Sequence, residues 1–387
     1  MERGSAYGLL GSNVAKHMGL IRRTLSNFGY ANALPTARRF SRKADAVSVN
    51  PNLSTAPSNA TAGCSSSSAS DFLSQFSSTN HANLTLALSP SLGGNRTFLV
   101  HLPQNYYAST PHALVLSFHG FKSAALKQES ITGFSEPGVL INGKGLVAVY
   151  PEGQFGPGKN GDESIRAWQG APYSPPGVDD IGFTQALLAH LSDNLCLDSN
   201  RFYASGKSNG GGFTNLLACT PSTASLFAAF APVSAALYAG ANPADCAPGR
   251  SVPIINFHGL ADTVIPFDGR DADKEGRTEY ATPNITQYRE AWAARNGCGA
   301  GTSSTKVGGR VKLSSHIALN QAPLISHPHE NTTLKAFTCD SQVNGFTVDG
   351  LGHSWPGTAG LDGGVTTFNA TTANIVPFFE TYALGDS

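Results

Sequence analysis

Short, uninterrupted apolar runs alternate with segments of helical periodicity along most of the chain. In the segment Asp180–Leu191, apolar residues recur every three or four positions, as in a helix that packs on a sheet. The apolar runs predict strands at Arg96–Leu102, Ala113–Phe118, Leu146–Tyr150, Arg201–Ala204, Phe227–Pro232, Pro253–Phe257 and Gly345–Val348. The periodic segments predict helices at Asp179–Leu195, Gly211–Cys219, Ile285–Asn296 and Thr372–Tyr382. Unbroken apolar strands separated by helices predict an α/β fold, with a mostly parallel sheet that is covered by helices on both faces.

The N-terminal region differs in composition from the rest of the chain. Residues 1–63 carry eight Lys or Arg but two acidic residues, and contain no apolar core of the length that a secretory signal needs. This composition is typical of a mitochondrial presequence. The alternative explanation is an error in the first exon of the gene model. We therefore expect a disordered or leader segment, 1–63, followed by one α/β domain, 64–387, in which Ser65–Thr79 forms a tether. Gly299–Glu330 lacks periodicity and is expected to form an excursion at the rim of the domain.

The net charge and the hydrophobic runs of the chain bear on whether it binds nucleic acid or a membrane. The 387 residues contain 26 basic and 26 acidic side chains, so that residues 64–387 alone have a formal charge of −6. A mildly acidic domain argues against nucleic acid as a partner. No apolar run approaches the ~18 residues of a membrane span, so we expect a soluble protein that does not enter a membrane. We also expect a monomer.

The six cysteines lack the C-x-x-C spacing of zinc or redox sites, and no metal site is expected. Their even number and wide spacing predict three disulfides and a secreted, extracellular protein. The preferred pairing is Cys298 with Cys339, which would close the excursion at its base, followed by Cys219 with Cys246 and Cys64 with Cys196. The number of glycosylation sequons is close to that expected by chance, so they are compatible with secretion but do not indicate it. They lie at Asn59, Asn83, Asn95, Asn284, Asn331 and Asn369.

Ser208 lies in the pentapeptide Gly206–Gly210, which matches the G-x-S-x-G pattern of a nucleophile elbow. The pattern alone is weak evidence in a chain this rich in Gly and Ser. Its context is more specific, because a strand-like run, Arg201–Ala204, precedes it and a helix-like segment, Gly211–Ala218, follows it. On such a turn the serine oxygen stands clear of the sheet, and the helix directs free N–H groups toward an anion.

The other two members of a catalytic triad follow in the chain order Ser, Asp, His. Asp262 comes directly after the strand-like run Val252–Gly259, where α/β-hydrolases place the acid, and His353 lies in a glycine-flanked loop after the last predicted strand. Asp268 is a competing acid in the same loop as Asp262. We prefer Asp262, because a residue close to the end of a strand can be held rigidly against the imidazole.

A fourth element is the apolar run Leu114–Phe121, which ends in a His-Gly turn. In this fold such a turn supplies one donor of the oxyanion hole, here the backbone N–H of Phe121, alongside the N–H of Asn209. His119 and His258 each precede a glycine after an apolar strand. For both we expect structural hydrogen bonds rather than catalysis.

Together these segments resemble secreted fungal feruloyl esterases of the C type, which belong to the polyhydroxybutyrate-depolymerase-like esterases. The resemblance runs from about Cys64 to the C-terminus, and five blocks in combination carry it. They are Trp168–Tyr173, Gly177–Asp180, Gly206–Phe213, Phe257–Asp262 and Gly350–Pro356. The chain departs from the family in lacking a secretion signal and in the loosely patterned Gly299–Glu330.

The resemblance implies an α/β-hydrolase fold and an enzyme that releases ferulic and related hydroxycinnamic acids from xylan or pectin, without a cofactor. It places Ser208, Asp262 and His353 in the triad. Trp168 and Trp355 are candidate walls for the phenolic ring, since a planar acyl group gains from stacking; the alternatives are a core or lid role for Trp168 and support of the histidine loop for Trp355. Other functional readings are an acetylxylan esterase, a polyhydroxyalkanoate depolymerase and an inactive hydrolase-fold binding protein.

Overall fold

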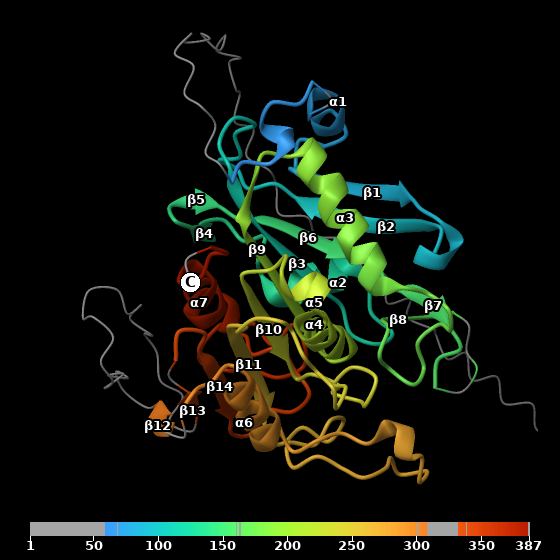
Figure 1. Cartoon of the computed structure of the whole chain (residues 1–387), viewed down its shortest axis with the longest axis vertical. Helices are drawn as coiled ribbons and strands as arrows, with labels where there is room; N and C mark the ends of the chain where they lie inside the picture. Colours follow the sequence, from blue (N-terminus) through green and yellow to red (C-terminus); the bar gives the residue numbers. More distant parts are fainter. Residues whose placement is uncertain are drawn as a thin grey trace, which may run out of the picture. The chain divides into compact units, whose positions relative to one another are not determined.

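A computed structural model of the protein describes residues 59–67, 69–159, 161, 164–299, 302–307, 332–337 and 339–385. Within them a ten-stranded sheet has the order β1-β2-β6-β3-β9-β10-β11-β14-β13-β12 (Figure 1). The strands are β1 (His81–Ala87), β2 (Asn95–His101), β3 (His112–Phe118), β6 (Val147–Pro151), β9 (Leu197–Lys207), β10 (Ala229–Val233), β11 (Ile254–Gly259), β12 (Thr302–Val307), β13 (Thr332–Phe337) and β14 (Val343–Val348). The six central strands from β6 to β14 run parallel, and the outer strands on both sides pair antiparallel.

Helices cover both faces of this sheet. All of β3 is buried, and its side chains alternate between two apolar cores, with Leu114 and Leu116 in one core and Ala113 and Val115 in the other. The first core holds α1 (Ala69–Leu73), α3 (Asp180–Asn194), α4 (Asn209–Cys219) and α6 (Ile285–Arg295), and the second holds α2 (Ala125–Thr132) and α7 (Val376–Glu380). The three long helices α3, α4 and α6 lie over the same face in Figure 1. This confirms the predicted fold class.

Smaller elements complete the described chain. They are the helix α5 (Pro221–Ala224), the 3-10 turns η1 (Ala62–Cys64), η2 (Pro90–Leu92) and η3 (Thr278–Tyr280), the π-helical turn η4 (Thr371–Ile375), and the hairpins β4 (Leu140–Ile141) with β5 (Lys144–Gly145) and β7 (Gln154–Gly156) with β8 (Ile165–Ala167). The helix predicted at Thr372–Tyr382 is divided, because the π-helical turn precedes α7. No helix among the described residues is long and apolar enough to cross a membrane.

The predicted boundary at Cys64 and the predicted tether both need correction. Thr61 donates its backbone N–H to the Leu197 carbonyl at 2.9 Å, so the described domain includes residues before Cys64. Within the expected tether, α1 forms because Phe72 buries its ring in the core. The remaining leader residues, 1–58, lie outside the described residues, as does most of the expected excursion apart from β12.

The six cysteines form three disulfides, with the same pairing that the sequence analysis put first. Cys64 is bonded to Cys196, Cys219 to Cys246, and Cys298 to Cys339. The first ties the turn η1 to the residue before β9, and the second links the C-terminus of α4 to the chain that follows β10. These two bonds therefore join segments that the sheet alone does not hold together.

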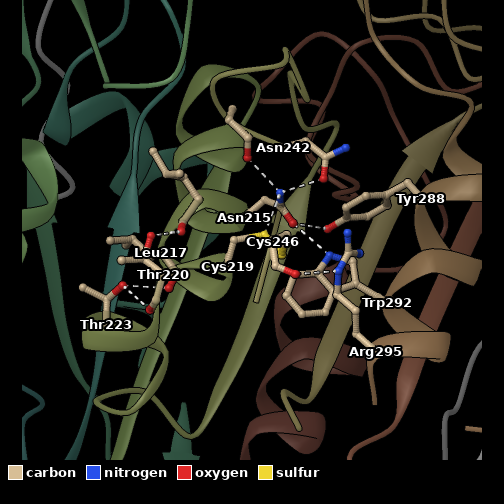
Figure 2. The surroundings of a disulfide bond; sticks show 12 residues. Asn215, Leu217, Cys219, Thr220, Thr223, Asn242, Cys246, Tyr288, Trp292 and Arg295 are labelled. Carbon is tan, nitrogen blue, oxygen red and sulfur yellow. Dashed lines mark hydrogen bonds between the residues drawn. A yellow bond between two sulfur atoms is a disulfide. The ribbon is translucent and has the colours of Figure 1, made fainter. Parts of the chain in front are cut away.

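A buried polar network next to the second disulfide fixes α4 against α6 (Figure 2). Asn215 lies in α4, and its side-chain oxygen accepts hydrogen bonds from Tyr288 Oη at 3.0 Å and Trp292 Nε1 at 2.9 Å, both in α6. Its amide nitrogen donates to the Ala241 carbonyl at 2.8 Å. Because α4 begins directly after Ser208, this network also holds the helix that carries the candidate nucleophile.

Candidate active site

Ser208 occupies a strained turn between β9 and α4. Its backbone dihedrals are φ 56° and ψ −119°, a conformation that costs free energy in a residue with a side chain. Backbone hydrogen bonds enforce the turn: the Ser208 N–H donates to the Val233 carbonyl, and the Ser208 carbonyl accepts from Gly212 and Ala236. The geometry is that of a nucleophile elbow.

The two motif glycines are required by close backbone contacts. A Cβ atom at Gly206 would lie 2.3 Å from the Gly210 carbonyl oxygen, and one at Gly210 would lie 2.1 Å from the Phe118 carbonyl oxygen. Any side chain at either position would therefore push α4 away from β3 or β9. The spacing of small residues in the sequence reflects this packing.

Asp262 and His353 form the second part of the site. The Nδ1 atom of His353 lies 2.7 Å from Oδ2 of Asp262. The other carboxylate oxygen, Oδ1, accepts the backbone N–H groups of Val264 at 2.9 Å and Ile265 at 2.8 Å. Asp262 follows β11 and His353 follows β14, so two neighbouring parallel strands bring them to the edge of the sheet where Ser208 follows β9.

The hydrogen bonds of Asp262 keep its carboxyl ionised. Burial by itself raises the pKa of Asp262, but the hydrogen bond and charge of His353, with the Ile265 N–H, bring this pKa below its usual value. His258 lies behind the pair, with Nε2 2.8 Å from the Ile265 carbonyl and 3.4 Å from Asp262 Oδ2. Burial lowers the pKa of His258 to about 4, so that this histidine is neutral near pH 7.

Asp268, the competing acid, is exposed and lies 3.4 Å from the Asn284 side chain. His119 is buried, with Nδ1 2.8 Å from the Gly120 carbonyl, and its Nε2 accepts the Gly153 N–H at 2.9 Å. Both His119 and His258 thus make the structural hydrogen bonds expected of them.

The two expected oxyanion donors flank Ser208. A Cβ atom at Gly120 would lie 3.3 Å from Ser208 Cβ, and Phe121, the next residue, lines the same cavity as the serine. Asn209 is the first residue of α4, where a backbone N–H has no partner within the helix. The Asn209 side chain is held by Trp168, whose N–H donates to Oδ1 at 2.8 Å and whose carbonyl accepts from Nδ2 at 3.3 Å.

The prediction that Trp168 and Trp355 form walls for the substrate is wrong. Both are buried, at 0% and 1% exposed, and neither lines the cavity that contains Ser208 and His353. Trp168 stacks on Phe213 and donates from Nε1 to the His119 carbonyl at 2.9 Å, so it packs beneath the elbow. Trp355 donates from Nε1 to Thr371 Oγ1 at 3.2 Å and thereby supports the loop of His353.

Other aromatic residues line the cavity, which has a volume of about 250 Å³. Phe121, Tyr173 and Tyr238 form one wall, with the rings of Phe121 and Tyr173 4.4 Å apart. The ammonium group of Lys159 lies 5.4 Å from the ring centre of Phe121 and 5.5 Å from that of Tyr173. Burial, and then the positive charges of neighbouring arginines, lower the pKa of Lys159. No sequence pattern indicates this wall, because its members come from separate loops.

An ion pair in the cavity wall joins the elbow to the histidine loop. Lys207 Nζ lies 2.9 Å from Asp362 Oδ2, and the same carboxylate oxygen accepts the Trp355 backbone N–H at 2.7 Å. Lys207 directly precedes Ser208, and Asp362 binds the backbone of Trp355, two residues after His353. Asp362 therefore couples the two halves of the site. Among the described residues, no group of three His, Cys, Asp or Glu side chains could hold a metal ion.

Ser208, Asp262 and His353 each follow a different strand of the parallel sheet. This is the arrangement of a serine hydrolase on the α/β-hydrolase fold.

No family model matches the chain. The chain is similar to Feruloyl esterase B of Piromyces equi, at 29% identity over 205 residues that cover 52% of this chain and 36% of that protein. It is also similar to Probable feruloyl esterase C of Aspergillus flavus, at 26% identity over 179 residues that cover 45% of this chain and 58% of that protein. The matches thus span only about a third to a little over half of these curated relatives.

Among solved structures, a CE1 ferulic acid esterase from Anaeromyces mucronatus in complex with ferulic acid aligns with a TM-score of 0.43 and 13% identity. The alignment covers 79% of this chain and 90% of that chain.

Proposed function

We propose that this protein is a carboxylic ester hydrolase that works through an acyl-enzyme, with Ser208 as nucleophile, His353 as general base and Asp262 as the orienting acid. One observation carries this proposal. The 2.7 Å hydrogen bond between His353 and Asp262 borders the same cavity as Ser208, which itself stands on a strained elbow. An inactive binding protein would have no need to maintain this strain.

Ser208 Oγ attacks the ester carbonyl carbon while His353 Nε2 takes its proton. The negative charge that develops on the carbonyl oxygen is stabilised by the N–H groups of Phe121 and Asn209. The alcohol then leaves with the proton from His353, and water releases the acid by the same steps in reverse. Asp262 holds the imidazole in the tautomer whose Nε2 can accept a proton. The reaction requires water and no cofactor.

The substrate class that we propose is an ester of ferulic or a related hydroxycinnamic acid with a plant cell-wall polysaccharide such as xylan or pectin. Feruloyl esterases are among the relatives of this chain, and an aromatic wall of Phe121, Tyr173 and Tyr238 borders the nucleophile. A planar phenolic acyl group can stack on such a wall, whereas an acetyl group cannot. The three disulfides favour an oxidising, extracellular location.

The catalytic assignment is tested with Ser208→Ala. Turnover of methyl ferulate is expected to fall on the order of 10⁶-fold while the thermal unfolding temperature stays near that of the wild type. Ser205→Ala is the matched control, because Ser205 is a buried serine of the same strand that hydrogen-bonds the Ala231 carbonyl at 3.0 Å. Retention of more than a few per cent of wild-type turnover by Ser208→Ala would refute the assignment.

The substrate class is tested by comparing methyl ferulate with an acetyl ester, an acetylated xylan and a short polyhydroxyalkanoate. Phe121→Ala keeps the backbone donor but removes the ring, and is expected to lower kcat/KM on methyl ferulate by about 2- to 13-fold. The loss on an acetyl ester should be much smaller. Tyr107→Ala, at an aromatic residue that is 64% exposed and does not line the cavity, is the control. Equal losses on both esters, or faster turnover of acetylated xylan by the wild type, would contradict the hydroxycinnamate proposal.

A further inference from the structure

A second cavity, of about 350 Å³, adjoins the catalytic one. Ser123 and Lys127 line both cavities and therefore form the wall between them. Lys122, Phe155 and Arg166 also line the second cavity. We call this cavity the basic pocket.

Among the described residues, the side chains that line the basic pocket carry positive charge, whereas the domain as a whole is acidic. Lys122, Lys127 and Arg166 line it, and no Asp or Glu does so among the residues that the structure describes. Arg166 also lies 3.5 Å from Glu152, outside the lining, so its charge is partly compensated. Residues 64–387 nevertheless carry a formal charge of −6. Local cations in such a domain favour the approach of an anionic ligand.

An exposed aromatic ring lies beside these cations. Phe155, in the hairpin of β7 and β8, is 51% exposed, and the Arg166 guanidinium lies 4.3 Å from its ring centre. The pairing keeps the ring and the guanidinium in fixed relative positions. An apolar surface next to fixed cations suits a sugar ring, which has an apolar C–H face, when that sugar also carries a carboxylate.

Lys122 is placed at the pocket by an unusual backbone. Its φ is 61°, which few residues other than glycine adopt, and it directly follows Phe121 of the proposed oxyanion hole. The same turn thus places Phe121 in the lining of one cavity and Lys122 in the lining of the next, with the Lys122 ammonium group 5.6 Å from the ring centre of Phe121. Ligands in the two cavities would therefore lie next to each other.

We propose that the basic pocket binds a carboxylate-bearing sugar unit, a uronate, in the polysaccharide that leaves during ester hydrolysis. The inference rests on the proposed function, in which the aromatic wall takes the acyl group and the alcohol part lies on the other side of Ser208. Lys122 and Arg166 contact the carboxylate, and Phe155 packs against the sugar ring. The enzyme then prefers feruloylated chains that contain acidic sugars over neutral chains of the same length.

The test measures binding rather than turnover, so its outcome does not depend on the ester specificity. Ser208→Ala protein is titrated calorimetrically with ester-free oligosaccharides of matched length, namely an oligogalacturonate, a glucuronate-substituted xylo-oligosaccharide and an unsubstituted xylo-oligosaccharide. At low salt, one or both acidic ligands should bind several-fold more tightly than the neutral ligand, and the tighter one identifies the source of the uronate as galacturonate or xylan-linked glucuronate. The preference should shrink in about 0.5 M salt, because screening weakens exposed ionic contacts.

Charge-removing variants identify the pocket. In the Ser208→Ala background, Lys122→Gln and Arg166→Gln should each weaken binding of the acidic ligand by about 5-fold, the upper range for exposed ion pairs. Lys335→Gln, which removes the same charge from a residue that lines neither cavity, should have no effect. Thermal unfolding curves check that each variant is folded.

Equal affinity for acidic and neutral ligands, absence of measurable binding to either acidic ligand, or equal losses in Lys122→Gln and Lys335→Gln would each overturn the proposal. If the acidic ligands bind as expected while the wild type fails to hydrolyse methyl ferulate, the pocket stands and the proposed ester specificity fails. If the wild type hydrolyses methyl ferulate but the acidic ligands bind no more tightly than the neutral one, the proposed function stands and the uronate pocket is refuted.

Discussion

Replacing Asp262 by asparagine separates the role of the acid from the shape of the site. The side chain keeps its size, and its single oxygen can still accept the N–H groups of Val264 and Ile265. The amide nitrogen then occupies the position of Oδ2, which lies 2.7 Å from His353 Nδ1 and 3.4 Å from His258 Nε2. An amide nitrogen can only donate hydrogen bonds, so His353 Nδ1 must become an acceptor.

The consequence is a change of tautomer. With Nδ1 as acceptor, the imidazole carries its proton on Nε2 and cannot take the proton of Ser208. A change of this kind in a serine hydrolase costs about 10⁴-fold in kcat, or about 5.5 kcal/mol of transition-state stabilisation. We therefore expect Asp262→Asn to hydrolyse methyl ferulate about 10⁴ times more slowly at pH 7, with a KM close to that of the wild type.

Asp268→Asn is the matched control. Asp268 is the competing acid in the same loop, and it is exposed and contacts Asn284 instead of His353. Steady-state kinetics on both variants, with circular dichroism to verify folding, should show a near-normal rate for Asp268→Asn. If Asp262→Asn stays within tenfold of the wild type, or if Asp268→Asn loses the larger factor, the assignment of the acid is wrong.

Three further variants test the structure around the site. Asn215→Ala removes the acceptor of two buried donors and is expected to lower the free energy of unfolding by about 2–6 kcal/mol in urea titrations, and a loss under 1 kcal/mol would contradict the network. Trp168→Ala should reduce kcat/KM equally on methyl ferulate and on an acetyl ester, whereas a loss confined to the ferulate would restore this residue as a substrate wall. Glu129, in α2, lies with Oε1 2.8 Å from Nε2 of His81, in β1, and this hydrogen bond raises the pKa of His81. The pair therefore stabilises the fold below the unfolded pKa of about 6.5, and this stability is lost as the pH rises through the folded pKa. Glu129→Gln should therefore lower Tm more at about pH 5.5 than at about pH 8.5. Equal decreases in Tm at the two pH values would contradict the raised pKa of His81.

The central strands could be predicted because burial on both faces leaves a direct trace in the sequence. Strands such as β3 and β10 are apolar at nearly every position, since helices cover both sides of them. The edge strand β1 was missed, because its polar residues alternate with Ala82 and Leu84, which are buried on one face alone. The predicted tether failed for a similar reason: one buried residue, Phe72, is enough to dock α1 in an otherwise polar segment.

The wrong expectation for the tryptophans has a different cause. Sequence places Trp168 and Trp355 near the triad, and both are near it, but it does not say on which side of the backbone a large ring lies. Each ring points into the core and donates its indole N–H to a buried acceptor. The residues that do line the cavity with Ser208, such as Tyr173, Tyr238 and Lys159, belong to loops with no shared motif.

Three features could be inferred from the sequence: the glycine-framed elbow at Ser208, the chain order Ser, Asp, His, and the apolar strands, which indicate a parallel sheet covered on both faces. The elbow follows from local backbone geometry and the strands from burial on both faces, and each leaves a pattern within a few residues. The tertiary structure was needed to identify the contact of His353 with Asp262, the ion pair of Lys207 with Asp362 and the aromatic wall. Each of these joins loops that are far apart in the chain, and their distances are set by strand order and packing, which no short pattern records.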